Sequence, residues 1–111
     1  FYDNEDFLRF LDKARAAGID VPIEAGIMPV MNAKSVLNMS NKCQSKVPEK
    51  LGIMLDKWGG DKALLKEAGN AYASEQSCEL VARGVDGVHL YTMNHPCVSR
   101  RIWSNVKPFF V

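Results

Sequence analysis

Two short apolar segments, set far apart among helical patterns, most limit what this chain can fold into. Residues 21–27 and 87–92 have the composition of buried strands, and amphipathic patterns precede, separate and follow them. Strands that alternate with helices pair in parallel through right-handed crossovers. Two strands are too few for such a sheet. The pattern therefore indicates an α/β fold that is either the last part of a (βα)8 TIM barrel, which takes about 250 residues when complete, or a smaller doubly wound sheet without all its strands.

Five segments carry the signals that begin and end helices. Side chains that cap helices, or a proline, stand before the apolar stripes, and glycine follows several of them. Four apolar residues of the first segment fall at helical spacing and predict one buried stripe: Phe7, Phe10, Leu11 and Ala14. The expected helices start at Asp3 or Asn4, Asn32, Pro48, Asp61 and Asn94 or Pro96, and the first four end near Gly18, Asn41, Gly59 and Arg83.

The two ends of the sequence predict that it is a piece of a longer chain. Phe1 is not methionine, and residues 1–3 have the pattern of the end of a buried strand. The other end stops on three apolar residues, 109–111. No linker or internal repeat divides the chain. We therefore expect residues 1–111 to form a single block, with about the last two to three βα units of the barrel.

Charge and cysteine content exclude several classes of protein. The formal net charge is +1, which gives no electrostatic reason to expect nucleic acid or an anionic membrane as a partner. No apolar run approaches the roughly 18 residues of a membrane span. Cys43, Cys78 and Cys97 are odd in number and widely spaced. Neither a disulfide framework nor a structural zinc site is expected, and a cytoplasmic location is favoured.

The carboxyl ends of the strands are where ligands bind in either architecture. This rule selects residues 1–4, 26–30 and 91–95. Gly26 and Pro29 change the chain direction after the first strand, either to shape a ligand loop or as ordinary turn residues. No glycine-rich dinucleotide motif, P-loop, zinc-protease motif or nucleophile elbow accompanies them in the sequence.

Three titratable residues near the strands have more than one interpretation. His95 follows the second strand, where it either contacts a ligand or is simply exposed. His89 lies inside that strand and is interpreted as a hydrogen-bonded core or interface residue. Glu24, in an otherwise apolar strand, either faces a polar barrel layer with a partner outside this chain or handles a proton.

Several runs of residues together resemble one enzyme family. Residues 26–30, GIMPV, resemble the "GI-x-P-V" strand and loop of the 5,10-methylenetetrahydrofolate reductases. Residues 87–94, GVHLYTMN, are similar to the closing strand of that family, which usually ends "hFYTLN". Residues 1–3, FYD, are similar to the "F-F-D" that ends its sixth strand. The matches follow in the correct order, from residue 1 to about residue 106.

The resemblance implies a fold and a reaction. The family is a flavin-bearing (βα)8 barrel that reduces 5,10-methylenetetrahydrofolate to 5-methyltetrahydrofolate. Electrons pass from NAD(P)H, or another donor in some members, to FAD and then as hydride to the one-carbon unit of the folate substrate. The catalytic glutamate of the family and most of its FAD-binding residues belong to the first five strands, outside this sequence. The segment alone is therefore expected to hold no flavin and to have no activity, and no general acid is assigned within it.

The resemblance also implies binding roles for four residues. Ser35 stands where many members have a folate-contacting glutamine, and Met39 where an aromatic residue or leucine packs on the aminobenzoyl ring or the nicotinamide. His95 matches an arginine that commonly meets folate. Met93 corresponds to a leucine near the flavin end of the pocket. The first three are thus expected to bind substrate, and Met93 the cofactor.

Two alternatives to this function stay open from the sequence. One is a non-catalytic half-barrel module that pairs its open sheet edges with another copy or a complementary chain. The apolar residues 109–111 favour this alternative. The other is a related barrel with a different pterin or electron donor. The expected partners are the remaining N-terminal barrel residues and the folate, with a homo-oligomer or an electron-donating subunit also possible.

Overall fold

The two predicted strands form one parallel sheet in the computed structural model, which describes residues 1–110. β1 (Glu24–Ile27) pairs with β2 (Gly87–Leu90), with Glu24 opposite Gly87 and Ile27 opposite Leu90. Both strands are shorter than expected. The backbone N–H of Ile23 donates to the Asp86 carboxylate rather than to a strand (2.9 Å).

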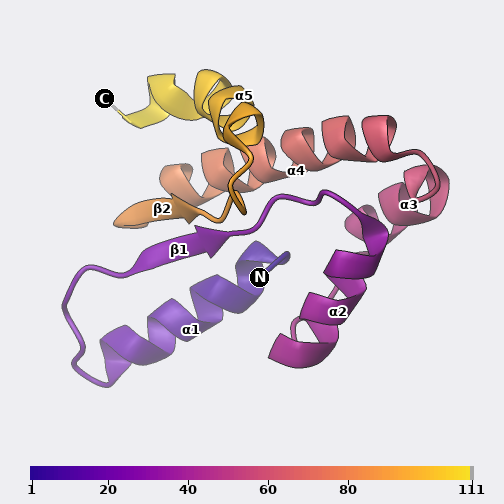
Figure 1. Ribbon diagram of the computed structural model, residues 1–111. Coiled ribbons are helices and arrows are strands. Elements are labelled where there is room, and N and C mark those ends of the chain that lie inside the picture. Colours follow the sequence, from indigo (N-terminus) through magenta and orange to yellow (C-terminus); the bar gives the residue numbers. More distant parts are fainter. Residues whose placement is uncertain (111) are drawn as a thin grey trace.

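Within residues 1–110, five α-helices and one 3-10 helix accompany the sheet. Their bounds are α1 (Asn4–Ala16), α2 (Ala33–Cys43), α3 (Glu49–Trp58), α4 (Lys62–Ala82), α5 (Pro96–Val106) and η1 (Lys107–Phe110). In Figure 1, α4 and α5 lie on one side of the strands, α1 lies beyond β1, and α2 and α3 gather past the end of β1. None of the helices within residues 1–110 has the length and apolar character needed to cross a membrane.

Side-chain caps explain where three of these helices begin, as the sequence predicts. Asp3 accepts from the N–H of Glu5, Asn32 from the N–H of Ser35, and Asp61 from those of Ala63 and Leu64. The expectation that Asn94 caps the last helix is wrong. Asn94 has φ 64°, and the residue at the N-cap of α5 is His95, without a capping hydrogen bond from its side chain.

Residues 1–3 do not form the predicted strand. Within residues 1–110 the sheet consists of β1 and β2 alone. The backbone of Tyr2 is held by a helix instead, since the Tyr72 hydroxyl donates to the Tyr2 carbonyl oxygen at 2.5 Å. Phe1 stacks on Phe7, with 5.1 Å between ring centroids.

The core lies on one face of the sheet. Ala25 and Ile27 are fully buried there, against Ala73 and Leu80 of α4. The same apolar cluster includes Val98 and Ile102 of α5 and Phe7 of α1. The predicted α1 stripe is only partly correct, because Phe10 is 56% exposed.

A second apolar cluster holds α2, α3 and α4 together. Its fully buried members are Leu51 of α3 and Leu65 of α4, together with Val36 of α2. Three half-buried side chains of α3 pack against it: Met54, Leu55 and Trp58.

The opposite face of the sheet is open. Glu24, His89 and Tyr91 are exposed on it, and Gly26 lies between them, half-buried. Of the two interpretations of His89, a core or an interface residue, the core is excluded within residues 1–110, and the interface stays a prediction. The His89 ring lies in a T-shaped contact with the Tyr91 ring, with 4.6 Å between ring centroids. Parallel sheets normally bury both faces, whereas within residues 1–110 only one face of this sheet is buried.

Gly69 brings α4 directly against the segment that follows β1. A Cβ atom at Gly69 would lie 2.1 Å from the carbonyl oxygen of Val30 and 2.9 Å from its carbonyl carbon. This approach is possible only without a side chain, and it holds residues 28–32 at the end of the sheet.

Candidate functional site

A cavity of about 440 Å³ opens where both strands end. The segments that follow β1 and β2, residues 28–32 and 91–95, leave the sheet at the same end because the strands are parallel. The cavity lies between these two segments and α2. We call it the strand-end cavity; its lining residues are Tyr2, Met28, Pro29, Met31, Asn32, Ser35, Val36, Met39, Lys62, Met93 and His95.

All four residues selected from the sequence line this cavity. Ser35 and Met39 come from α2, one helical turn apart, so they share one face of that helix. Met93 and His95 come from the segment after β2, across the cavity. Met93 is 70% exposed, so its thioether is free to meet a ligand.

Local backbone chemistry sets these positions. The Asn32 side chain fixes the first turn of α2 by accepting from the N–H of Ser35 at 2.7 Å. After β2, one more backbone bond joins Tyr91 N–H to the Ile27 oxygen at 2.9 Å. The chain then turns sharply through Met93, at φ 49°, and Asn94. This left-handed turn directs residues 93–95 to the cavity instead of continuing the sheet.

The apolar wall of the cavity is rich in methionine. Met28, Met31, Met39 and Met93 line it, whereas the chain has five methionines in total. Thioethers are flexible and polarizable, and they pack well on aromatic rings. The wall thus suits a planar aromatic ligand.

Four lining residues lie outside both the residues and the strand-end segments selected from the sequence: Met31, Asn32, Val36 and Lys62. Lys62, the first residue of α4, is the only lysine, arginine, aspartate or glutamate on the cavity. The position of Lys62 directly after the helix cap Asp61 is a sequence feature that could have indicated a place on this cavity, because helix N-termini lie at the ligand-binding edge of such folds. Tyr2 lies in residues 1–4, a segment that the strand-end rule selected, but the sequence assigned its side chain no role of its own.

A second cavity of about 330 Å³ continues along the open face of the sheet. It shares Tyr2, Met28 and Met39 with the strand-end cavity. Here the Tyr91 ring covers Gly26, where a Cβ atom would lie 2.8 Å from the ring. Gly26 is therefore needed for the close approach of Tyr91, and the two cavities form one continuous concave region.

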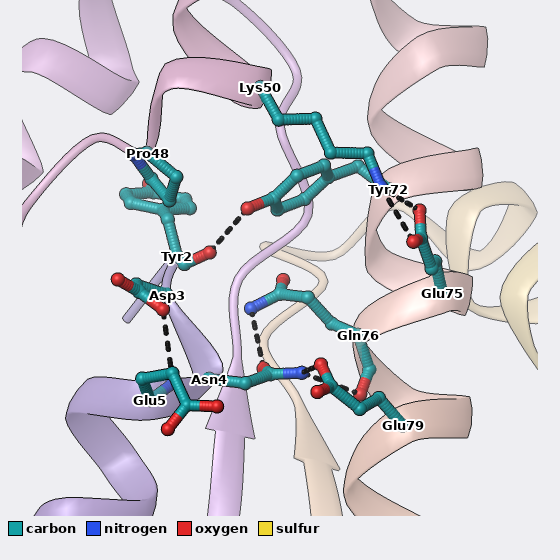
Figure 2. Close-up of a pocket in the computed structure, with 10 residues that line it drawn as sticks. All are labelled: Tyr2, Asp3, Asn4, Glu5, Pro48, Lys50, Tyr72, Glu75, Gln76 and Glu79. Atoms are coloured by element: carbon teal, nitrogen blue, oxygen red, sulfur yellow. Dashed lines mark hydrogen bonds and ion pairs between the residues drawn. The ribbon is translucent and has the colours of Figure 1, made fainter.

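A smaller pocket of about 170 Å³ lies between α1 and α4, on the other side of Tyr2 (Figure 2). Asn4 and Gln76 are buried in it and bind each other, with Gln76 Nε2 donating to Asn4 Oδ1 at 3.2 Å. Asn4 Nδ2 also donates to Glu79 at 2.6 Å. These bonds join the start of α1 to the middle of α4, which gives the pocket a structural role.

Tyr72 in this pocket makes folding sensitive to alkaline pH. Burial, followed by the negative charges of Asp3, Glu75 and Glu79, raises its pKa to about 12. The folded state therefore favours the neutral phenol. We expect the stability contribution of this group to be complete below pH 10 and to be lost as the pH rises from about 10 to about 12.

The difference between wild type and Tyr72→Phe isolates this effect from other groups that titrate in the same range. Urea unfolding between pH 8 and 12 should give a difference in unfolding free energy that shrinks above pH 10. At pH 8 the variant should be less stable by about 1–3 kcal/mol, because the Tyr2 carbonyl loses its buried donor. A difference that does not change with pH would contradict the prediction.

No group of three or more histidine, cysteine, aspartate and glutamate side chains within residues 1–110 is arranged to hold a metal ion. The side chains that the strand-end cavity offers to a ligand include four methionines, one lysine, one histidine, one tyrosine and short polar side chains.

Comparison with known proteins identifies the family. The family model described as "Methylenetetrahydrofolate reductase" matches residues 1–107. The chain belongs to the methylenetetrahydrofolate reductase family. The resemblance of its strand-end motifs to that family is thereby confirmed.

Individual members of the methylenetetrahydrofolate reductase family match most of this chain. "Methylenetetrahydrofolate reductase (NADH) 1" of Arabidopsis thaliana is 37% identical over 94 residues, which are 85% of this chain and 16% of the plant protein. The "5,10-methylenetetrahydrofolate reductase" proteins of Pectobacterium carotovorum and Escherichia coli are 35% and 34% identical over 102 residues. Those residues are 92% of this chain and 34% of each bacterial protein. The chain thus spans about a third or less of the length of these relatives.

Proposed function

We propose that this chain forms the folate-binding wall of a methylenetetrahydrofolate reductase barrel. The complete protein would reduce 5,10-methylenetetrahydrofolate to 5-methyltetrahydrofolate, with electrons from NAD(P)H through FAD. The observation that carries the proposal is the meeting of Ser35, Met39, Met93 and His95 on one cavity, in a chain whose family is established.

The chemistry of the cavity agrees with a folate. Folates combine a flat pterin, an aminobenzoyl ring and a glutamate with two carboxylates. The methionine wall offers a soft apolar surface to the rings. Lys62 offers a cation to a carboxylate, and Ser35 and His95 offer hydrogen-bonding groups on the same cavity.

The contribution of this chain to the reaction is to bind and orient. The strand-end cavity would hold the folate against one wall and exclude water from its ring face, so that the one-carbon unit stays within reach of the cofactor. The exposed thioether of Met93 fits the edge of a flavin ring. FAD, when bound, supplies the hydride. No side chain described here is assigned as the acid, so we place that group on the other strands of the barrel.

The open face of the sheet supports completion of this barrel by further strands. Glu24, Gly26 and His89 would face its interior, and Glu24 would then lie in a polar layer of the lumen. The apolar pocket formed by Val88, Leu90, Trp103 and Phe110 would be covered by the element next to β2. Additional strands therefore explain both uncovered surfaces.

The alternative of a non-catalytic module rests on the same surfaces. Trp103, Phe109 and Phe110 are 52%, 54% and 41% exposed, which is the character of an interface. Pairing with a second copy would give a dimer of the natural protein in light scattering. A homo-oligomer or an electron-donating subunit remains part of the proposal, as does a cytoplasmic location, which three free cysteines favour.

An assay of the natural full-length protein tests the proposal. Purified protein should carry FAD, and it should oxidise NADH or NADPH only when 5,10-methylenetetrahydrofolate is present. The product should be 5-methyltetrahydrofolate. A flavin-free protein that consumes neither donor with this folate would overturn the function and favour the non-catalytic module.

Lys62 gives a sharper test of the folate tail. Lys62→Gln should raise the KM for 5,10-methylenetetrahydrofolate about fivefold, corresponding to about 1 kcal/mol for an exposed ion pair. The wild-type KM should also rise with salt, and that of the variant much less. Lys57→Gln is the matched control, because it removes the same charge from α3, away from the strand-end cavity. Equal KM changes in the two variants would count against a contact with the folate carboxylate.

A further inference from the structure

Tyr2 is a buried polar residue that lies where three cavities meet. It lines the strand-end cavity, the cavity on the open sheet face, and the small pocket of Figure 2. Only 3% of its surface is exposed. Its place before α1 is fixed from the main chain, because its carbonyl oxygen accepts from the Tyr72 hydroxyl at 2.5 Å.

The Tyr2 side chain points away from that anchor. Figure 2 shows the carbonyl turned toward Tyr72 and the ring extending in the other direction. The ring packs in the apolar cluster with Val36 of α2, on the same helix as the cavity residues Ser35 and Met39. The ring therefore extends from the small pocket toward the wall that the two larger cavities share.

The hydroxyl at the end of this ring has no protein partner. Among residues 1–110, no hydrogen bond to the Tyr2 hydroxyl is formed, whereas the Tyr72 hydroxyl has its acceptor. The Tyr2 hydroxyl is also not sealed away: the one fully sealed side-chain oxygen or nitrogen without a partner in this part of the chain is Asn70 Oδ1. A buried hydroxyl normally finds a partner, whereas this donor is left unused by the described residues.

We propose that the Tyr2 hydroxyl donates a hydrogen bond to the folate held in the strand-end cavity and thereby fixes how its ring lies on the methionine wall. This inference deepens the proposed function and rests on it. The methionine side chains offer an apolar contact surface but do not fix the orientation of a ring that lies on it, because dispersion contacts are not directional. A single phenol donor among them would fix the orientation of the folate ring by donating to an acceptor on the aromatic part of the folate.

The protonation state of Tyr2 agrees with a donor. Burial, followed by the nearby Cys43 thiol, raises the pKa of the phenol above its ordinary value. The group thus keeps its proton throughout the physiological range. Phenylalanine at this position would preserve the packing and the main-chain anchor but would lose the donor.

The test is steady-state kinetics of Tyr2→Phe in the natural full-length enzyme. We expect the KM for 5,10-methylenetetrahydrofolate and the dissociation constant of 5-methyltetrahydrofolate to rise about 3- to 10-fold, the worth of one hydrogen bond. The melting temperature should stay within about 2 °C of wild type, since a change of 1 kcal/mol shifts it by several degrees.

Tyr72→Phe is the matched control, because it also removes a buried phenol oxygen, but one that the protein itself binds. It should lower the melting temperature, because the Tyr2 carbonyl loses its donor, whereas Tyr2→Phe should not. If Tyr2→Phe leaves the folate KM unchanged in an active enzyme, or lowers stability as Tyr72→Phe does, the inference fails and the proposed function stands. A wild-type protein that neither binds nor reduces the folate would overturn both.

Discussion

Replacement of Gly69 by alanine should destabilise the protein by about 3 kcal/mol, at the upper end of what overpacking of a core costs. The added methyl would lie 2.1 Å from the Val30 carbonyl oxygen, and the group it meets is main chain, which has no rotamer to change. Either α4 or residues 28–32 must move. Urea unfolding measures the loss of free energy. Binding of 5-methyltetrahydrofolate should weaken as well, because the displaced segment lines the strand-end cavity.

Gly52 provides the control for this change. It also lies within a helix, α3, but a Cβ atom there meets nothing within 4 Å. Gly52→Ala should therefore stabilise the protein by about 0.5–1 kcal/mol, because alanine favours the helix more than glycine does. Changes of the same sign and size in the two variants would show that the close approach of α4 to Val30 does not constrain this fold.

Replacement of Met39 by aspartate should lower kcat/KM for the folate about a hundredfold. Met39 is half-buried on the wall shared by both large cavities. A carboxylate there would lose hydration under the bound ring and would repel the carboxylates of the folate. Such an unpaired charge costs several kcal/mol when buried, and about 3 kcal/mol corresponds to a hundredfold change.

Met54→Asp is the matched control for Met39→Asp. Met54 is also a half-buried methionine on a helix, but it lines a separate groove on α3 together with Lys50 and Lys57. This variant should keep kcat/KM within about threefold of wild type, even if its stability falls, because an exposed charge in a groove with two lysines interacts weakly with a distant ligand. A loss of equal size in both variants would mean that Met39 acts through the fold and not through the ligand.

The sequence predicted the helices and three of their starting residues better than it predicted the bounds of the strands. Caps at Asp3, Asn32 and Asp61 are local interactions, so the starts of α1, α2 and α4 follow from a few neighbouring residues. The strand that was expected from residue 21 begins at Glu24 because a side chain distant in sequence, Asp86, captures the N–H of Ile23. A hydrogen bond between residues so far apart in sequence cannot be predicted from the pattern of neighbouring residues.

The site shows the same division between local and distant information. Ser35, Met39, Met93 and His95 were selected by resemblance, and the structure places them on one cavity. Their individual roles stay proposals. The sequence selected the segment that contains Tyr2 but gave its side chain no role, because its burial depends on α2 and α4. The exposure of His89 depends on a sheet face that nothing within residues 1–110 covers.

The most direct test of the central claim is methyl NMR of the natural enzyme labelled at methionine, with signals assigned by single replacements. The chain has its own internal reference: Met28, Met31, Met39 and Met93 line the strand-end cavity, and Met54 lies on α3 outside it. Saturation with 5-methyltetrahydrofolate should shift the four cavity methyls and leave that of Met54 in place. Four unmoved cavity signals in a protein that binds this folate would contradict the account.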